Sequence, residues 1–233
     1  MQKGPVSKYG PDENVTWETL NRTEVSTVAM WIEVIGTIIS ALGNTPALTF
    51  IGPQLASDLN LVGDTIQLGG TVIQVEDEKN LTYNKIGNII QVAGNSEEIA
   101  GYAIPLNLTD LRTLLQTQGN AIQLTGISLS FIFTQVQPTL SSIEEAYGTM
   151  LQILGLGMQT LSGGFPSSNE FGQNLNTTGN WVQVIGAILQ AIGQTRYLEK
   201  LRLRYLQEAS VHTPTNPSVT RYYALSNANQ NRK

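Results

Sequence analysis

Glycine recurs every seven residues in this chain, and the clearest example is the stretch from Gly179 to Gly193. The stretch reads GNWVQVIGAILQAIG, and a glutamine follows each of its first two glycines at a distance of four residues. Because a helix turns by about 100° per residue, residues seven apart lie on nearly the same side of it. The spacing therefore predicts a helix that carries a stripe of glycine and glutamine along one side.

Five looser copies of this pattern precede the stretch and divide the chain into six expected helices. Sustained spacing of seven favours helix over strand, even in β-branched pieces such as residues 71–75. We expect Thr109 to cap the fourth helix and Ser141 to open the fifth in a capping box. The helices are expected over residues 16–43, 54–76, 82–102, 109–137, 141–162 and 168–209, with breaks at glycine, asparagine, proline or charged turns.

The predicted fold class is all-α, a bundle or array of about six helices with heptad-spaced glycines. Hydrophobic residues make up 41% of the chain, which is enough for a folded core. Proline, glycine and polar residues crowd both ends of the chain. We therefore predict three regions: a flexible arm over 1–15, a helical-repeat domain over 16–209 and a flexible tail over 210–233.

The expected helices have two distinct sides. In the stretch from Gly179, residues Trp181, Val182, Val184 and Ile185 form an apolar arc about 160° wide that lies opposite the glycine stripe. We expect this apolar arc to face a core. An exposed glycine within a helix costs about 1 kcal/mol relative to alanine, so the stripe is expected to be a second, tight packing surface.

The stripe could meet the same chain, another copy of the chain, or water, and the sequence leaves these three alternatives open. The residues predicted to form the packing surface are Gly36, Gly43, Gly63, Gly70, Gly87, Gly94, Gly119, Gly126, Gly148, Gly155, Gly179, Gln183, Gly186, Gln190 and Gly193.

Three segments carry a resemblance to a known family: AMWIEVIGTIISALGNTP, GNIIQVAGN and GNWVQVIGAILQAIGQT. They resemble an uncharacterised family of repetitive proteins from Bacillus and relatives, marked by G-N-x-[IV]-Q-x-[IT]-G units and W-[IV]-x-x-I-G helices. The resemblance covers about residues 28–195. It implies a soluble or spore-associated bacterial protein and brings no catalytic or binding residues with it.

The sequence offers little for catalysis or cofactor binding. The chain has no cysteine, and its one histidine, His212, lies in the expected tail, where it is not held for a triad or a metal site. The acid pairs Glu97-Glu98 and Glu144-Glu145 are adjacent on helices, so their side chains diverge. We therefore predict that the protein is not an enzyme and has no cofactor or metal. Because the body is acidic, we do not expect nucleic acid as a partner.

Two functions remain from the sequence. The first is a structural or interaction protein that packs or self-assembles through its Gly/Gln faces, helped by a charged content of only 13%. The alternative is a membrane-active helical bundle of the pore-forming kind, which the wide apolar arcs would allow. We find neither a signal peptide nor an ordinary membrane-spanning segment and expect a cytoplasmic or spore-associated location.

Overall fold

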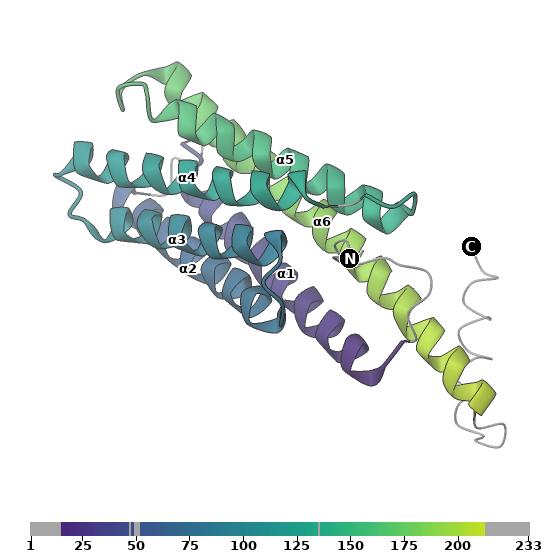
Figure 1. Cartoon of the computed structure of the whole chain (residues 1–233). Coiled ribbons are helices and arrows are strands. Elements are labelled where there is room, and N and C mark those ends of the chain that lie inside the picture. The colour runs from purple at the N-terminus through teal and green to yellow at the C-terminus, as the bar shows by residue number, and fades with distance from the viewer. Residues whose placement is uncertain (1–14, 47, 49–51, 135, 213–233) are drawn as a thin grey trace.

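A computed structural model describes residues 15–46, 48, 52–134 and 136–212 (Figure 1). Within these residues the chain forms helices and no strand, which confirms the all-α prediction. The expected arm over 1–15 and the expected tail fall almost wholly outside the described residues. The described helices are α1 (Trp17–Gly43), α2 (Pro53–Asp77), α3 (Tyr83–Ala103), α4 (Thr109–Ile132), α5 (Leu140–Ser162) and α6 (Glu170–His212).

The helix ends follow local capping chemistry, with four differences from expectation. Leu108 occupies the N-cap of α4, so Thr109 is its first helical residue and not its cap. In α5 the cap is Thr139, whose hydroxyl accepts a hydrogen bond from the Ser142 backbone N–H, in place of the expected capping box at Ser141. Helix α4 ends at Ile132, five residues before the expected position, and α6 continues to His212.

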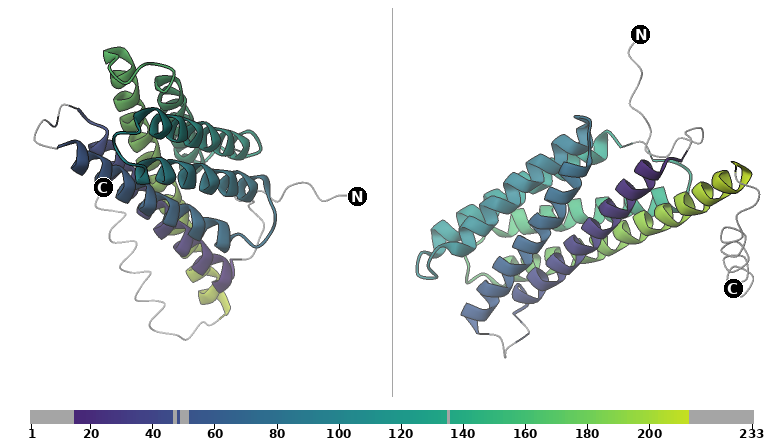
Figure 2. Two further views of the ribbon diagram at one scale, coloured as in Figure 1. Left: turned by 90° about the vertical axis from the view of Figure 1, so that its left-hand side faces the viewer. Right: turned by 90° about the horizontal axis from the view of Figure 1, so that it is seen from below.

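The six described helices form a closed ring. Each helix contacts its neighbours in the chain, and α1 also contacts α6. No other pair of described helices is in close backbone contact. In two orientations α1 and α6 lie side by side, and their ends project beyond the other helices (Figures 1 and 2).

Consecutive helices pair into three antiparallel hairpins, and glycine faces glycine inside each one. A Cβ atom added to Gly36 of α1 would lie 2.5 Å from the carbonyl oxygen of Gly63 in α2. In the next hairpin, a Cβ atom on Gly94 would lie 2.6 Å from the carbonyl oxygen of Gly119. The backbones of paired helices therefore touch directly, at a distance that a side chain would prevent.

Only part of the apolar arc faces a core, which corrects the sequence expectation. In the stretch from Gly179, Ile185 is 57% exposed and Trp181 is 36% exposed, while Val184 is buried. The same outward position is occupied by Ile35 in α1 and Leu154 in α5, which are 53% and 58% exposed. The line of close glycine contacts between the two helices of a hairpin is called here the glycine seam. Because the seam is the side on which each helix packs against its hairpin partner, much of the apolar arc is left on the outside of the ring.

One described helix, α1, is long and apolar enough to cross a membrane by length and composition alone. The sequence predicts no ordinary membrane-spanning segment, and α1 meets the criterion by length and composition only. Of the 18-residue window that meets the criterion, 44% is buried inside the structure. A core helix of a water-soluble protein can meet the same criterion, so this feature by itself does not place the protein in a membrane.

The contact between α1 and α6 is the part of the ring that is held by ordinary apolar packing. Met30 and Val34 of α1 pack against Ala187 and Ala191 of α6. A second buried cluster joins the start of α1 to the far end of α6 through residues that include Leu20, Leu198 and Leu201. Apolar burial therefore closes the ring between its first and last helices.

Two reciprocal hydrogen bonds accompany this contact. The indole N–H of Trp31 in α1 donates to the Thr195 hydroxyl in α6, at 3.1 Å. The indole N–H of Trp181 in α6 donates to the Thr45 hydroxyl just beyond α1, at 3.0 Å. Each helix thus contributes a tryptophan that donates a hydrogen bond to a threonine hydroxyl of the other side, as their similar sequences predict.

Adjacent glycines of α2 test the seam. A Cβ atom on Gly70 would lie 2.5 Å from the Glu33 side chain and 2.7 Å from the Ala29 carbonyl oxygen, whereas one on Gly69 would meet nothing within 4 Å. We expect Gly70→Ala to lower the free energy of unfolding by about 1–3 kcal/mol through overpacking. Gly69→Ala should raise it by up to about 1 kcal/mol through helix propensity. Urea denaturation measures both, and equal effects of the two substitutions would contradict the seam.

Candidate functional site

The residue that follows each seam glycine lies on the inner side of the ring. It sits about 100° around the helix from the seam. Twelve of these thirteen residues are buried, and Asn44 at the end of α1 is partly buried. The set is Thr37, Asn44, Asp64, Thr71, Asn88, Asn95, Asn120, Ile127, Thr149, Leu156, Asn180, Ala187 and Gln194. Most members are polar, so the interior of this ring is lined by amides, hydroxyls and a carboxyl group.

Glutamines along the stripe bridge the seams. In the third hairpin the Gln159 side-chain amide donates to the Gln183 amide oxygen at 2.7 Å, and Gln152 donates to Gln190 at 2.5 Å. Gln190 also donates to the Thr149 hydroxyl at 3.3 Å. These pairs give partners to amides that burial would otherwise leave without hydrogen bonds.

Two buried carboxyl groups, Asp64 of α2 and Glu98 of α3, interact electrostatically. Burial is the main cause that raises the pKa of Asp64 to about 7, against the opposing effect of a hydrogen bond with Ser40. Burial, and then the nearby charge of Asp64, raise the pKa of Glu98 well above its ordinary value. Gln123 donates a hydrogen bond to the Glu98 carboxylate, and Asn120 also hydrogen-bonds this side chain.

A cavity of about 210 Å³ leads to Glu98. It lies at the end of the ring where α3 and α5 finish and where α4 and α6 begin. Glu98 is the one charged residue in its lining. Asn44, Tyr102 and Asn120 also line the cavity, together with residues of the turn between α5 and α6. The cavity is therefore polar, weakly acidic and connected to the carboxyl pair.

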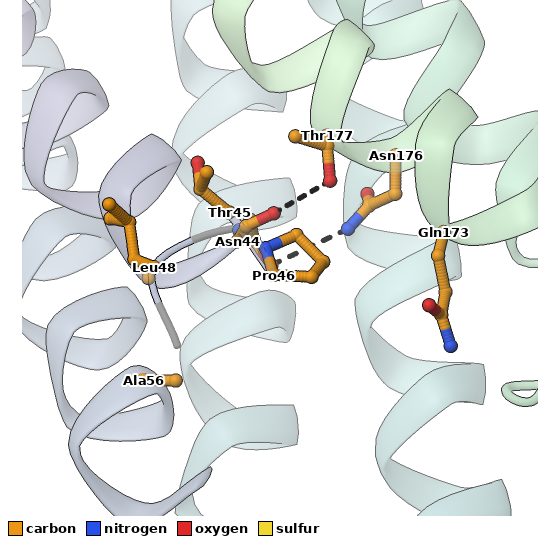
Figure 3. Close-up of a pocket in the computed structure, with 9 residues that line it drawn as sticks. Asn44, Thr45, Pro46, Leu48, Ala56, Gln173, Asn176 and Thr177 are labelled. Atoms are coloured by element: carbon orange, nitrogen blue, oxygen red, sulfur yellow. Dashed lines mark hydrogen bonds between the residues drawn. The ribbon is translucent and has the colours of Figure 1, made fainter. Parts of the chain in front are cut away.

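A second cavity, of about 230 Å³, lies beside the end of α1 (Figure 3). Thr177 of α6 donates a hydrogen bond to the Asn44 backbone carbonyl at 2.8 Å, and the Asn176 amide donates to the Asn44 side chain at 3.4 Å. Asn44 and Asn176 line both cavities. This second cavity has no charged residue among its lining residues, so it offers less chemistry than the first.

The structure places the predicted packing residues between helices of one chain. Five pairs of glycines face each other across the hairpins: Gly36 with Gly63, Gly87 with Gly126, Gly94 with Gly119, Gly148 with Gly186 and Gly155 with Gly179. Gly43, Gly70 and Gly193 instead meet Ala56, Ala29 and Ser141. Gln183 and Gln190 lie in the seam with their partners from α5. His212 ends α6, and its side chain is outside the described residues.

The inward position was not predicted from the sequence. Asp64, Asn95 and Asn120 were not among the predicted site residues, and Glu98 was considered only as part of the acid pair Glu97-Glu98. The signal that could have found them is the polar residue directly after glycine in the pairs Gly63-Asp64, Gly94-Asn95 and Gly119-Asn120. Among the described residues, no three or more His, Cys, Asp or Glu side chains gather closely enough to suggest a metal site of that kind.

The chain belongs to DUF6944, a family of unknown function, whose model matches residues 24–191. This match includes most of the ring, from α1 to the middle of α6. No curated protein and no solved structure matches the chain. The family assignment agrees with the expected resemblance to an uncharacterised family and supplies no activity.

A third carboxyl group, on the partly buried Glu33, gives the protein a pH dependence that can be measured. Burial raises the pKa of Glu33 in α1 to about 7, although hydrogen bonds with Thr71 and Gln74 oppose the shift. The folded state therefore holds a proton that the unfolded state has released, so the free energy of unfolding falls as pH rises from about 4.5 to about 7. Asp64 acts in the same direction.

The free energy of unfolding of the wild type is expected to fall between these two pH values. We expect Glu33→Gln to make this fall smaller by about 1–3 kcal/mol. Urea denaturation of the two proteins at several pH values measures it. Curves for the variant and the wild type that stay parallel across this range would show that Glu33 does not hold a proton in the folded state.

Proposed function

We propose that this member of the DUF6944 family is a non-enzymatic structural protein that associates with copies of itself through the apolar outer side of its helices. The observation that carries the proposal is the outer side of α5. Leu140, Tyr147, Leu154 and Leu161 are spaced by seven residues along it and are 58–66% exposed. Ile143 and Met150 lie between them and are 38% and 44% exposed.

This spacing is the pattern with which helices pack against one another in coiled coils. Monomeric water-soluble proteins rarely leave large contiguous apolar patches exposed, and such patches mark interaction surfaces. No charged residue occurs between Tyr147 and Leu161, so a second copy would meet little charge repulsion at this face. These features support self-association through α5.

The proposal moves the assembly surface away from the Gly/Gln stripe. A glycine whose backbone already touches the neighbouring helix has no free surface for a second molecule. Gly186 is an example, because a Cβ atom there would lie 2.6 Å from the Gly148 carbonyl oxygen of the same chain. The stripe builds each hairpin, and the apolar arc on the outside is what remains for a partner.

A cytoplasmic or spore-associated location is part of this proposal. Its support is the resemblance of the repeat segments to proteins of Bacillus and relatives. A packing protein of low charge would suit an assembled layer or particle.

A membrane surface is the second candidate partner for the same outer side. The observation that favours it is that α6 carries no charged residue from Phe171 to Thr195, while Phe171, Trp181 and Ile185 are exposed along this length. Apolar helix sides rich in aromatic residues bind at the boundary of lipid headgroups and acyl chains.

Lysine substitutions on α5 test self-association. We expect Tyr147→Lys and Leu154→Lys each to weaken association about a hundred-fold or more, because a charge would be placed against an apolar partner. Light scattering on a sizing column across a concentration series gives the dissociation constant. Gln118→Lys adds the same charge at an exposed polar position of α4 and should leave association unchanged.

A wild-type chain that stays monomeric at all concentrations would exclude the proposed assembly. Flotation with liposomes of zwitterionic and anionic lipid then separates the second candidate. Binding that Ile185→Lys abolishes would assign the outer side to a membrane, whereas no flotation under either lipid composition would exclude that assignment.

A further inference from the structure

We propose that the ring binds a hard divalent cation of the calcium type between α2, α3 and α4, through oxygens of Asp64, Asn95, Glu98 and Asn120. The site lies behind the cavity at the end of the ring and is separate from the apolar outer side. It depends on neither self-association nor membrane binding.

The first observation is a set of buried oxygens with no hydrogen-bond partner among the described residues. They are Oδ2 of Asp64, Oδ1 of Asn95 and Oδ1 of Asn120. The three residues are only 4%, 2% and 6% exposed. A buried polar atom that is left unpaired costs on the order of 1–3 kcal/mol, so three such atoms in one region need an explanation.

The second observation is that these residues lie near one carboxyl group, that of Glu98. Asn120 of α4 hydrogen-bonds Glu98, and the charge of Asp64 in α2 acts on Glu98 directly. Asn95 precedes Glu98 by three residues on α3, a spacing that places two side chains on the same side of a helix. Three neighbouring helices therefore contribute four oxygen-bearing side chains to one region.

The third observation concerns the positive charge nearby. Arg112 of α4 is buried, but its guanidinium is held by backbone carbonyls of Tyr102 and Ile104, at 3.3 and 2.5 Å, and by the Ser57 hydroxyl at 2.9 Å. No hydrogen bond or ion pair joins it to Asp64 or Glu98 among the described contacts. The carboxyl pair thus has amide donors but no cationic side chain as a partner.

The chemistry of these groups points to a metal cation. Carboxylate and amide oxygens are hard ligands, and one cation can bind several of them at once, whereas a single donor group cannot. Once a cation has displaced the protons that burial favours, the two carboxylates balance a charge of two. Calcium accepts carboxylate and amide oxygens together in flexible geometry, while magnesium demands a stricter octahedron and keeps more of its waters. Glu98 and Asn120 line the cavity, which supplies a path of entry and room for water ligands.

Terbium and calcium are the probes for this site in the full-length protein. We expect terbium to give luminescence sensitised by nearby aromatic residues, of which Tyr102 lines the same cavity as Glu98. Calcium in excess should displace the terbium signal. Calcium at about a hundred times its dissociation constant should also raise Tm by about 5 °C or more at pH 7.5.

Two isosteric variants and one matched control complete the test. Asp64→Asn and Glu98→Gln each remove one carboxylate without changing its shape, and both should lose the terbium signal and the calcium-dependent rise in Tm. Glu97→Gln removes the same charge from the adjacent position of α3 and should keep both. Because replacing a buried carboxyl by its amide introduces no unpaired charge, circular dichroism should show that both variants remain helical.

Four results would overturn the inference. One is a wild-type Tm that does not respond to calcium up to millimolar concentration. Another is a calcium response that persists undiminished in both Asp64→Asn and Glu98→Gln. The third is an equal loss of response in Glu97→Gln, which would assign the effect to surface charge. A rise in Tm with sodium or potassium chloride that calcium does not exceed would likewise exclude a divalent site.

Discussion

Direct contact between helix backbones at glycine is the interaction on which the rest of this ring depends. Where Gly148 and Gly186 face each other, a Cβ atom on either would lie 2.6 Å from the carbonyl oxygen of the other. The close approach fixes which side of each helix meets its hairpin partner. It also determines the remaining positions, because the helix turn places the next residue inward and leaves the preceding residue outward.

The seam explains why the interior can be polar. Glutamine four residues after a glycine lies beside the seam, where it reaches a glutamine or glutamate of the partner helix, as Gln159 reaches Gln183 and Gln123 reaches Glu98. Amides that pair in this way do not require water. The pattern is less complete between α2, α3 and α4, where Asp64 and Glu98 come together and several oxygens stay unpaired. The unpaired oxygens are those of Asp64, Asn95 and Asn120, which follow a glycine and face inward, and the proposed cation site is located among them.

The sequence predicted the helices well because the residues that start and end a helix lie close to its ends in the sequence. Proline, glycine and hydroxyl caps stand close to the observed ends, and the start of α3 after Thr82 follows directly from them. The end of α4 was missed because nothing in residues 133–137 except the following proline stops a helix. The sequence of a single helix also could not show which of its sides faces the interior of the ring and which faces outward. A wide apolar arc favours a core on general grounds, but the glycine seam took the packing side, and Ile185 and Leu154 were left exposed.

The position that does identify the interior is the residue after glycine, and it was visible in the sequence as Gly-Asn and Gly-Asp pairs. Its meaning depends on a three-dimensional fact, that each hairpin turns the same side toward the other two. Spacing within one helix cannot show this, because the arrangement is decided between helices that are distant in the chain. One such contact between distant helices joins α1 and α6, where Met30, Val34, Ala187 and Ala191 are buried together. Here apolar side chains of α1 and α6 pack against each other, and their burial closes the ring.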